Sequence, residues 1–206
     1  MDPETRLRKS GVRNIAGVDE SGRGPLAGPV VAAAVILKED FRVKGLRDAK
    51  EMSLNDRLSM FIKIIEGSKT LGISIVDSRT IDQKNILQAS LYAMKEAVSS
   101  LDPKPKHVIV DGNQKIPKLG ILQTTVIAGD KICRSVSSAS VIAKVVRDEI
   151  MHLYDRIYPN YGFVNHKGYG TKEHLEMLVE HGPVSIHRLS YQPVIDALTL
   201  RGIIII

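Results

Sequence analysis

Four acidic residues stand where short apolar runs of the sequence end. Asp19 and Glu20 follow NIAGV, Asp111 follows HVIV, and Asp130 follows TTVIAG. Strand ends are rigid platforms at a domain surface, so carboxylates from different strands can meet there and bind a hard divalent cation through oxygen. Phosphodiester hydrolysis requires such a cluster: one Mg²⁺ or Mn²⁺ ion activates water, and a second stabilises the charge on the leaving oxygen.

Each of these acids also has an ordinary structural interpretation. A single Asp directly after a strand is most often a turn former or a helix cap. Because an acidic residue follows the apolar run at all three predicted strand ends, this alternative is weaker for the set than for any one acid. Spacing alone does not establish that the side chains converge, so convergence is an expectation.

Other hydrolytic chemistries have weaker support. His166 and His174 lie eight residues apart, but no HExxH or comparable spacing of zinc ligands is present. The sequence also lacks a GxSxG nucleophile elbow and a Walker A loop. Cys133 is the single cysteine, which excludes an internal disulfide, fits a reducing compartment and predicts a packing residue.

Residues 17–30, GVDESGRGPLAGPV, are dense in glycine and proline around one arginine. Glycine lets backbone amides approach a ligand closely, so this loop is a candidate phosphate or sugar contact. The alternative is an ordinary tight hairpin, because the glycine spacing matches neither a Walker nor a Rossmann loop.

The acids must be positioned by a sheet, and the apolar runs predict one. A mixed sheet with helices on its faces, an α/β architecture, follows from strands that alternate with helices. We expect strands at 14–19, 29–37, 71–77, 107–111 and 121–128, and helices at 54–65, 80–98 and 137–157, with a last helix from about 171.

Length and charge bound the class of protein. The 206 residues, 43% hydrophobic, suit one domain spanning 1–206. A net charge of +6 and a sequence pI near 9.4 tilt mildly toward an anionic partner such as nucleic acid. No apolar run approaches the roughly 18 residues of a membrane span, and no signal peptide is recognisable, so we expect a cytoplasmic protein.

The run GVDESGRGPLAGPVVAAAVIL closely resembles the opening motif of the ribonuclease HII family, in which an acid pair leads directly into a Gly-Arg-Gly loop. The resemblance extends from about residue 14 to 193 and implies a ribonuclease H-like fold, a five-stranded mixed sheet flanked by helices with a C-terminal helical segment. Residues 1–13 and 194–206 lie outside it and are expected as flexible ends. The other matching segments, in family order, are LRDAKEMS, IDQKNILQASLYAM, VDGNQKIP, AGDKICRSVSSASVIAKVVRD, YPNYGFVNHKGYGTKEH and GPVSIHRLSYQP.

The resemblance assigns roles residue by residue. It implies that Asp19, Glu20, Asp111 and Asp130 are the catalytic, metal-binding acids. The Gly22-Arg23-Gly24 loop matches the element that grips the backbone around a ribonucleotide, and Tyr169 in HKGYGT matches a tyrosine that stacks on the next sugar. Close backbone donors and acceptors suit recognition of a 2′-hydroxyl, whereas the ordinary alternative for the tyrosine is a core aromatic. Lys50 and Lys144 are expected phosphate contacts.

Two departures from the family pattern stand out, and we expect neither to touch the acids. The family often has Ser-Lys-Lys-Leu at residues 49–52, where this chain has AKEM; Glu51 removes a positive charge and weakens backbone affinity. At 137–140 a more alanine-rich run is replaced by SSAS. Asp148 has an unclear role, for which a surface ion pair or cap is favoured over metal binding.

The resemblance implies an endoribonuclease that uses two Mn²⁺ or Mg²⁺ ions. It would cut the RNA strand of RNA/DNA hybrids, and it would cut duplex DNA on the 5′ side of single ribonucleotides. The products would carry 5′-phosphate and 3′-hydroxyl ends. The implied role is the removal of ribonucleotides and RNA primers. We expect a monomer without membrane association; a sliding-clamp partner has no support in the sequence. The alternatives are a type 3 ribonuclease H, whose extra N-terminal domain the short leader leaves no room for, and a catalytically silent hybrid-binding protein.

Overall fold

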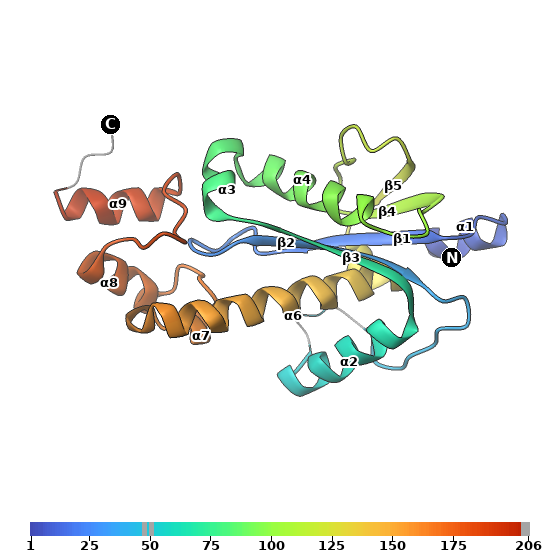
Figure 1. Ribbon diagram of the computed structural model, residues 1–206, viewed down its shortest axis with the longest axis horizontal. Coiled ribbons are helices and arrows are strands. Elements are labelled where there is room, and N and C mark those ends of the chain that lie inside the picture. Colours follow the sequence, from blue (N-terminus) through green and yellow to red (C-terminus); the bar gives the residue numbers. More distant parts are fainter. Residues whose placement is uncertain (47–48, 50–51, 203–206) are drawn as a thin grey trace. The chain divides into compact units, whose positions relative to one another are not determined.

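The computed structural model describes residues 1–46, 49 and 52–202. Its five strands form one mixed sheet in the order β3-β2-β1-β4-β5 (Figure 1). β1 runs antiparallel to β2 and parallel to β4, which is parallel to β5. The predicted five-stranded mixed sheet is therefore confirmed. The strands are β1 (Ile15–Ser21), β2 (Val30–Leu37), β3 (Ser68–Val76), β4 (His107–Asp111) and β5 (Leu122–Val126).

Helices connect and follow these strands, and those of the sheet's own unit flank the sheet. In the described part of the chain no helix is long and apolar enough to cross a membrane. The helical elements are α1 (Pro3–Lys9), α2 (Leu54–Gly67), α3 (Ser78–Lys84), α4 (Ile86–Ser99), α5 (Gly129–Ile132), α6 (Arg134–Ile157), the 3-10 turn η2 (Pro159–Tyr161), α7 (Phe163–His166), α8 (Lys172–His181) and α9 (Gln192–Leu200).

Some predicted helix boundaries were wrong. The single helix expected at 80–98 is two helices, because Asn85 adopts a positive φ of 64° between α3 and α4, and its side chain accepts a hydrogen bond from the Gln88 amide. The helix expected from about 171 is α8, capped by Thr171, but α9 follows it. The presumed leader contains α1, capped by Asp2. Neither α1 nor α9 was predicted.

The chain divides into two compact units, each assembled from three stretches. The sheet unit comprises Met1–Ser21, Val31–Ile75 and Ser90–Val145, and the second unit comprises Gly22–Val30, Val76–Ala89 and the chain from Val146 onward. Because the stretches interleave, neither unit is a consecutive segment. A single domain over 1–206 stays a prediction.

The sheet unit has helices on both faces of its sheet: α4 on one, α2 and the first half of α6 on the other (Figure 1). At Gly17 in β1 an added Cβ would lie 2.2 Å from backbone atoms of Ser135 and Val136, so α6 can approach this strand only over a glycine. Cys133 is buried beside Val136 in the adjoining core. Burial raises the pKa of its thiol to about 11, in agreement with a packing residue.

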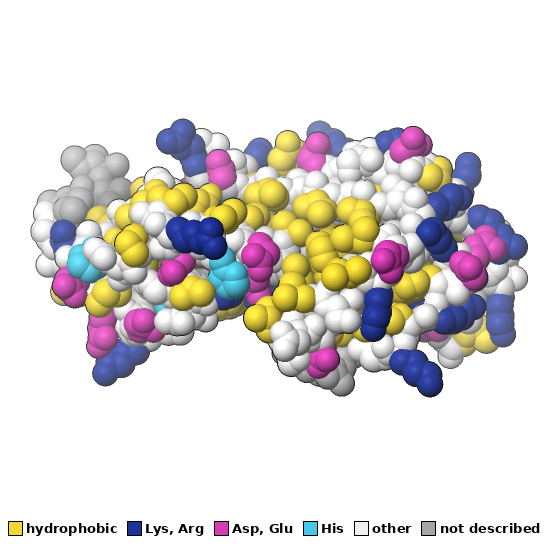
Figure 2. Space-filling view, turned by 60° about the horizontal axis from the view of Figure 1, so that its bottom comes forward, with side chains coloured by type: hydrophobic (Ala, Val, Ile, Leu, Met, Phe, Trp, Pro, Cys, Tyr) yellow, Lys and Arg dark blue, Asp and Glu magenta, His cyan; other side chains and the backbone are white. Residues whose placement is uncertain are grey.

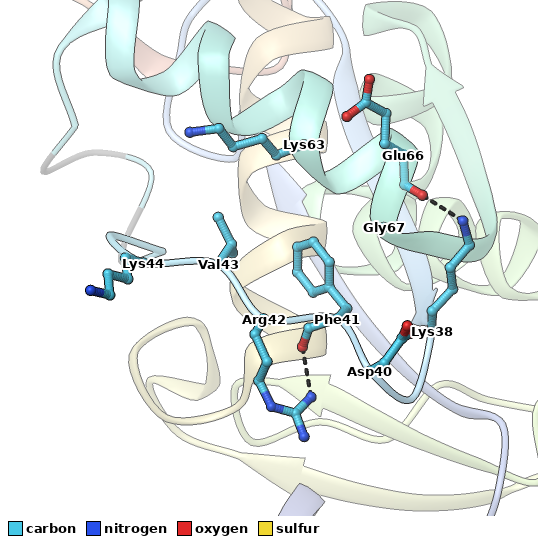
Figure 3. Close-up of a pocket in the computed structure, with 9 residues that line it drawn as sticks. All are labelled: Lys38, Asp40, Phe41, Arg42, Val43, Lys44, Lys63, Glu66 and Gly67. Atoms are coloured by element: carbon cyan, nitrogen blue, oxygen red, sulfur yellow. Dashed lines mark hydrogen bonds between the residues drawn. The ribbon is translucent and has the colours of Figure 1, made fainter.

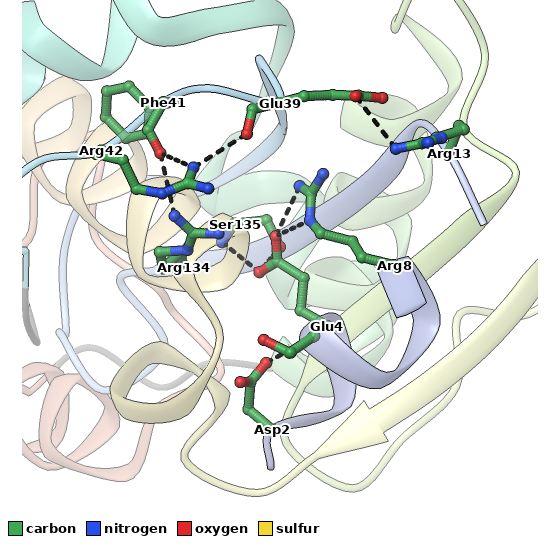
Figure 4. Close-up of polar contacts among 10 residues, drawn as sticks. Asp2, Glu4, Arg8, Arg13, Glu39, Phe41, Arg42, Arg134 and Ser135 are labelled. Atoms are coloured by element: carbon green, nitrogen blue, oxygen red, sulfur yellow. Dashed lines mark hydrogen bonds and ion pairs between the residues drawn. The ribbon is translucent and has the colours of Figure 1, made fainter. Parts of the chain in front are cut away.

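A buried carboxylate joins α1 to the start of α6 (Figure 4). Glu4 is 2% exposed; it accepts hydrogen bonds of 2.9 Å from both the amide and the hydroxyl of Ser135 and pairs with Arg8 at 2.9 Å. Ser135 lies in the first turn of α6, where backbone amides have no partner within the helix and a negative charge is favourable.

The second unit contains a cluster of buried histidines. His166 and His174 stack with ring centroids 4.5 Å apart, and His174 Nε2 lies 3.0 Å from His187 Nε2. Tyr161 and Phe163 stack on each other beside them. Burial lowers the pKa of His174 to about 4 and that of His187 to about 3, and the neighbouring histidines oppose a charge on either ring. Both rings are therefore neutral at neutral pH.

We expect Glu4→Gln to lower the free energy of unfolding by about 1–3 kcal/mol, because the variant keeps the shape but loses the charge that holds the α6 terminus. Urea denaturation measures the change. The matched control is Glu39→Gln, whose carboxylate is 66% exposed in its pair with Arg13 and whose effect should stay within about 0.5 kcal/mol. Equal effects of the two substitutions would contradict the anchoring role of Glu4.

We expect acid to destabilise the protein from the histidine range downward. The folded-state pKa values of His174 and His187 lie below the unfolded value near 6.5, so the unfolded chain takes up protons first as the pH falls. The stability present above pH 6.5 should fall by about 1.4 kcal/mol per pH unit for each such proton, down to pH 4 and below. Urea melts at pH 7.5, 6.5, 5.5 and 5.0 test this.

Asp19 opposes this trend, because its raised pKa lets the folded protein take up a proton before the unfolded chain does. The slope is therefore measured in the Asp19→Asn background, where a free energy of unfolding that stays flat or rises as the pH falls from 6.5 to 5.0 would contradict the assignment of buried neutral histidines. The control is His181→Gln, because His181 lies at the surface; that variant should keep the pH dependence of the parent protein.

Candidate active site

Adjacent parallel strands bring Asp19 and Asp111 to the same level. Val18 pairs with Val110, so the next residue of each strand carries a carboxylate. Asp111 ends β4 as predicted, but β1 continues to Ser21. Asp19 and Glu20 therefore lie within a strand and do not follow it, contrary to the sequence-based expectation.

Asp130 reaches this region from a helix. β5 ends at Val126, and Asp130 lies in the short helix α5, so its predicted place at a strand end was wrong. The amide of the preceding residue, Gly129, donates to Asp111 Oδ1 at 2.7 Å. This bond ties α5 to the end of β4 and places Asp130 one residue from a group that orients Asp111.

The Asp19 carboxyl is crowded by like charges. It is 6% exposed; burial raises its pKa well above the usual value, and the negative charges of Glu20 and Asp111 raise it further. Hydrogen bonds from the Ser140 hydroxyl and the Glu20 amide, the latter at 2.7 Å, partly offset these effects. A cation or another positive group beside this carboxyl would therefore stabilise its charged form.

The serines of SSAS do contact the acids, which corrects the expectation that they would not. Ser140 donates to the Asp19 carboxylate, and the Ser137 hydroxyl donates to the Asp130 carbonyl. Hydroxyls on α6 therefore supply donors to two of the predicted acids. The sequence held a signal for this in the departure from an alanine-rich run.

The donor set fits a hard divalent cation. Within residues 1–46, 49 and 52–202, no three His, Cys, Asp or Glu side chains are already arranged to hold a metal ion. The acids offer carboxylate oxygens, the ligands that Mg²⁺ and Mn²⁺ prefer, and a cation would relieve the repulsion that raises the pKa of Asp19. Convergence of all four acids on metal stays a prediction.

Two buried arginines hold the Gly-Arg-Gly loop within the second unit. Arg188 donates to the carbonyls of Gly22 at 2.5 Å, Arg23 at 2.8 Å and Gly28 at 3.0 Å. Arg147 donates to the carbonyls of residues 27 and 29 at 3.1 and 3.0 Å. Burial and the charge of Arg188 lower the pKa of Arg147 to about 10, which leaves it charged at neutral pH. The loop thus directs five carbonyls toward guanidinium groups.

Sequence reasoning assigned these two arginines no role. It also expected the side chain of Asp148, next to Arg147, at the surface. Asp148 is buried, so that expectation was wrong; its negative charge favours the charged form of Arg147.

Tyr169 lies beside the loop and not in a core. Its side chain is 43% exposed, which excludes the core-aromatic alternative. A Cβ added at Gly24 would lie 3.5 Å from the tyrosine ring. Gly22 adopts a positive φ of 101° and an added Cβ would meet the Arg147 side chain, so only glycine suits that position. Gly22, Arg23, Gly24 and Tyr169 are thus brought together in the second unit.

Of the two lysines predicted to contact phosphates, the structure describes only Lys144. Lys144 is half-buried on α6 and belongs to the sheet unit. Lys50 and the departure at Glu51 lie outside the described residues. Neither lysine has a tested role, so both stay predictions.

A cavity of about 560 Å³ lies in the sheet unit, away from the acids (Figure 3). It begins at Lys38, directly after β2, and this end of β2 pairs with the start of β1, opposite the end that carries the acids. Lys and Arg side chains also gather at the α1 end of the sheet unit (Figure 2). The cavity contains no predicted site residue; it is lined by Lys38, Asp40, Phe41, Arg42, Val43, Lys44, Lys63, Glu66 and Gly67.

Comparison with known proteins identifies the family. The sequence model described as ribonuclease HII matches residues 16–194. Ribonuclease HII of Lactobacillus delbrueckii subsp. bulgaricus is 46% identical over 187 residues, covering 91% of this chain and 72% of that protein. These matches establish the family by sequence.

Solved structures agree on the fold. The crystal structure of ribonuclease H2 from Pyrococcus horikoshii OT3 matches with a TM-score of 0.77 and 24% identity, over 91% of this chain and 98% of that one. The ribonuclease HII of the PCNA:RNase HII complex from Archaeoglobus fulgidus matches with a TM-score of 0.74 and 24% identity, over 86% and 95%. The chain belongs to the ribonuclease HII family, whose members are divalent-metal-dependent ribonucleases H that hydrolyse RNA in RNA/DNA hybrids.

Proposed function

We propose that this chain cuts on the 5′ side of ribonucleotides, both in the RNA strand of hybrids and at single ribonucleotides within duplex DNA, leaving 5′-phosphate and 3′-hydroxyl ends. One observation carries the proposal most. The strand that carries Asp19 and Glu20 leads within two residues into the loop Gly22–Gly24, which lies against Tyr169. The proposed catalytic acids are therefore followed directly in the chain by the loop that we propose contacts the ribose.

The acids would supply the metal ligands. Asp19, Glu20, Asp111 and Asp130 would hold the ions. Mn²⁺ or Mg²⁺ held there would supply activation of the attacking water and stabilisation of charge on the leaving 3′ oxygen. Ser140 steadies the Asp19 carboxylate, and the Gly129 amide fixes one oxygen of Asp111, so the protein limits the motion of both groups before substrate binds.

The loop and tyrosine would supply specificity. The arginines occupy carbonyls of the loop from the inside of the second unit, which holds the backbone of Gly22–Gly24 rigid. A rigid backbone can discriminate a 2′-hydroxyl by a close hydrogen bond that deoxyribose cannot make. The exposed Tyr169 ring beside Gly24 offers a flat surface for the neighbouring sugar. Lys50 and Lys144 would contact phosphates.

The substrate partners are RNA/DNA hybrids and duplex DNA that contains ribonucleotides. A sliding-clamp partner is supported only by the Archaeoglobus fulgidus neighbour, which was solved as a PCNA complex. We retain a monomer and a cytoplasmic location as predictions. A silent hybrid-binding protein is the main alternative, and the crowded acids argue against it, because the repulsion of the buried Asp19 carboxylate by Glu20 and Asp111 costs stability that binding alone does not require.

The first test uses a labelled DNA duplex with one embedded ribonucleotide, incubated with the protein and Mn²⁺, Mg²⁺ or chelator. We expect metal-dependent cutting at the 5′ side of the ribonucleotide only, and no cutting of the all-DNA control. Sequencing gels locate the cut, and phosphatase treatment identifies the ends. Binding without cutting under every metal condition would instead support the silent hybrid-binder.

Asp19→Asn should lower cleavage by about 100-fold or more, because the substitution removes a charged ligand from the ions, while hybrid binding is largely retained. Under conditions in which Asp19 is charged, the same substitution should raise the free energy of unfolding, because the neutral amide avoids the cost that burial, Glu20 and Asp111 impose on the charged carboxylate. Opposite changes in activity and stability separate loss of chemistry from misfolding.

Single-turnover cleavage, gel-shift binding and urea melts measure the three quantities. Asp40→Asn is the control, because Asp40 lies exposed in the sheet unit and its replacement should leave all three unchanged. Full activity in the Asp19 variant would refute the assignment of that acid.

A further inference from the structure

The His174–His187 pair is buried and takes no part in the chemistry proposed above. The Tyr169 carbonyl can only accept a hydrogen bond from His174 Nδ1, so the neutral pair has one consistent arrangement of ring protons. In that arrangement the longer, 3.3 Å approach of His187 Nδ1 to the Val184 carbonyl is not a hydrogen bond. The Val184 amide donates to His187 Nδ1 at 2.9 Å, so the neutral His187 ring carries its proton on Nε2 and donates it to His174 Nε2 at 3.0 Å. His174 then carries its proton on Nδ1 and donates it to the Tyr169 carbonyl at 2.9 Å.

This direction requires both rings to be neutral. Burial lowers the pKa of each histidine far below neutrality, and no ring nitrogen of the pair is left for a metal ion. The chain of hydrogen bonds therefore ends at the His174 Nδ1–H group, which donates to the Tyr169 carbonyl. The Tyr169 amide in turn donates to the His166 carbonyl at 2.9 Å, so its backbone is held on both sides while its ring stays exposed.

The other end of the pair is joined to the Gly-Arg-Gly loop. His187 forms an antiparallel bridge with Ala27, and the adjacent Arg188 amide donates to the Leu26 carbonyl at 2.9 Å. The Leu26 amide donates to the Gly168 carbonyl at 2.8 Å. The loop, the histidine pair and the tyrosine thus form a closed circuit of hydrogen bonds within the second unit.

We propose that His174 and His187 are positioning residues that hold Tyr169 in register with Gly24, and so set how fast a duplex with a single ribonucleotide is cut. The inference rests on the proposed function, in which loop and tyrosine contact adjacent nucleotides. The pair acts through the tyrosine backbone and touches no substrate. The Tyr169 carbonyl also accepts from the Thr171 amide at 2.8 Å, so loss of the histidine donor removes one of its two hydrogen bonds. The ring can then shift relative to the loop, and misplacement by about 1 Å lowers the rate by up to about 100-fold.

Two isosteric polar variants provide the test. In His174→Asn the amide nitrogen stands where the ring Nδ1–H stood, so the bond to the Tyr169 carbonyl is kept. In His174→Gln the amide extends one bond further, toward His187, and that donor is lost. We expect the Gln variant to cut a single-ribonucleotide duplex about 10-fold more slowly in single-turnover assays, and the Asn variant to stay within about 3-fold of the parent protein.

A double-mutant cycle asks whether the effect passes through the tyrosine. In a Tyr169→Ala background His174→Gln should cost little further activity, because the ring it positions is gone. His181→Gln, a surface histidine in the same unit, is the matched control and should leave cleavage unchanged. Far-UV circular dichroism and urea melts confirm that each variant is folded.

The inference is overturned by equal losses in the Asn and Gln variants, by unchanged cleavage in the Gln variant, or by a full 10-fold loss in the Tyr169→Ala background. Failure of the parent protein to cut any ribonucleotide substrate with either metal is a different result. That outcome overturns the proposed function itself.

Discussion

Parallel pairing of β1 with β4 is the constraint on which the acidic site depends. It sets Val18 opposite Val110, so Asp19 and Asp111 must follow side by side, and the buried Asp19 carboxyl pays an electrostatic penalty that raises its pKa. The surroundings limit that penalty without removing it: Ser140 and a backbone amide donate to Asp19, and Gly129 donates to Asp111. A site with such repulsion has a strong preference for positive charge.

The second unit buries positively charged side chains, whereas the acidic site crowds negatively charged ones. Arg147 and Arg188 lie in its interior, and backbone carbonyls of one loop neutralise much of their cost through hydrogen bonds. A loop whose carbonyls are occupied in this way has little freedom to rearrange. Gly22 is required there for two reasons, its positive φ and the close approach of Arg147, so sequence and packing both fix the shape of the loop.

Sequence predicted the sheet well and the polar interior poorly. The run HVIV gave the bounds of β4 without error, since a short apolar run between polar residues has few alternatives. The break at Asn85 escaped prediction because its positive φ interrupts an otherwise continuous apolar stripe. Asp148, Arg147 and Arg188 look like surface residues in sequence; their burial depends on partners as far as 166 residues away, which no local pattern reveals. The roles of the acids and of Tyr169 came from the family resemblance, whereas the contacts of Ser140 and the histidines came from the structure.

The two electrostatic arrangements meet through the covalent chain. Glu20 and Gly22 are separated by one residue, so the acids and the arginine-held loop cannot move independently at that point. A substitution that loosened the loop would therefore reach the strand that carries Asp19, and repulsion among the acids would act on the first residues of the loop. The buried guanidinium groups hold the loop carbonyls through hydrogen bonds of 2.5–3.1 Å, so the chain that leaves the acidic strand enters a segment whose backbone groups already have partners.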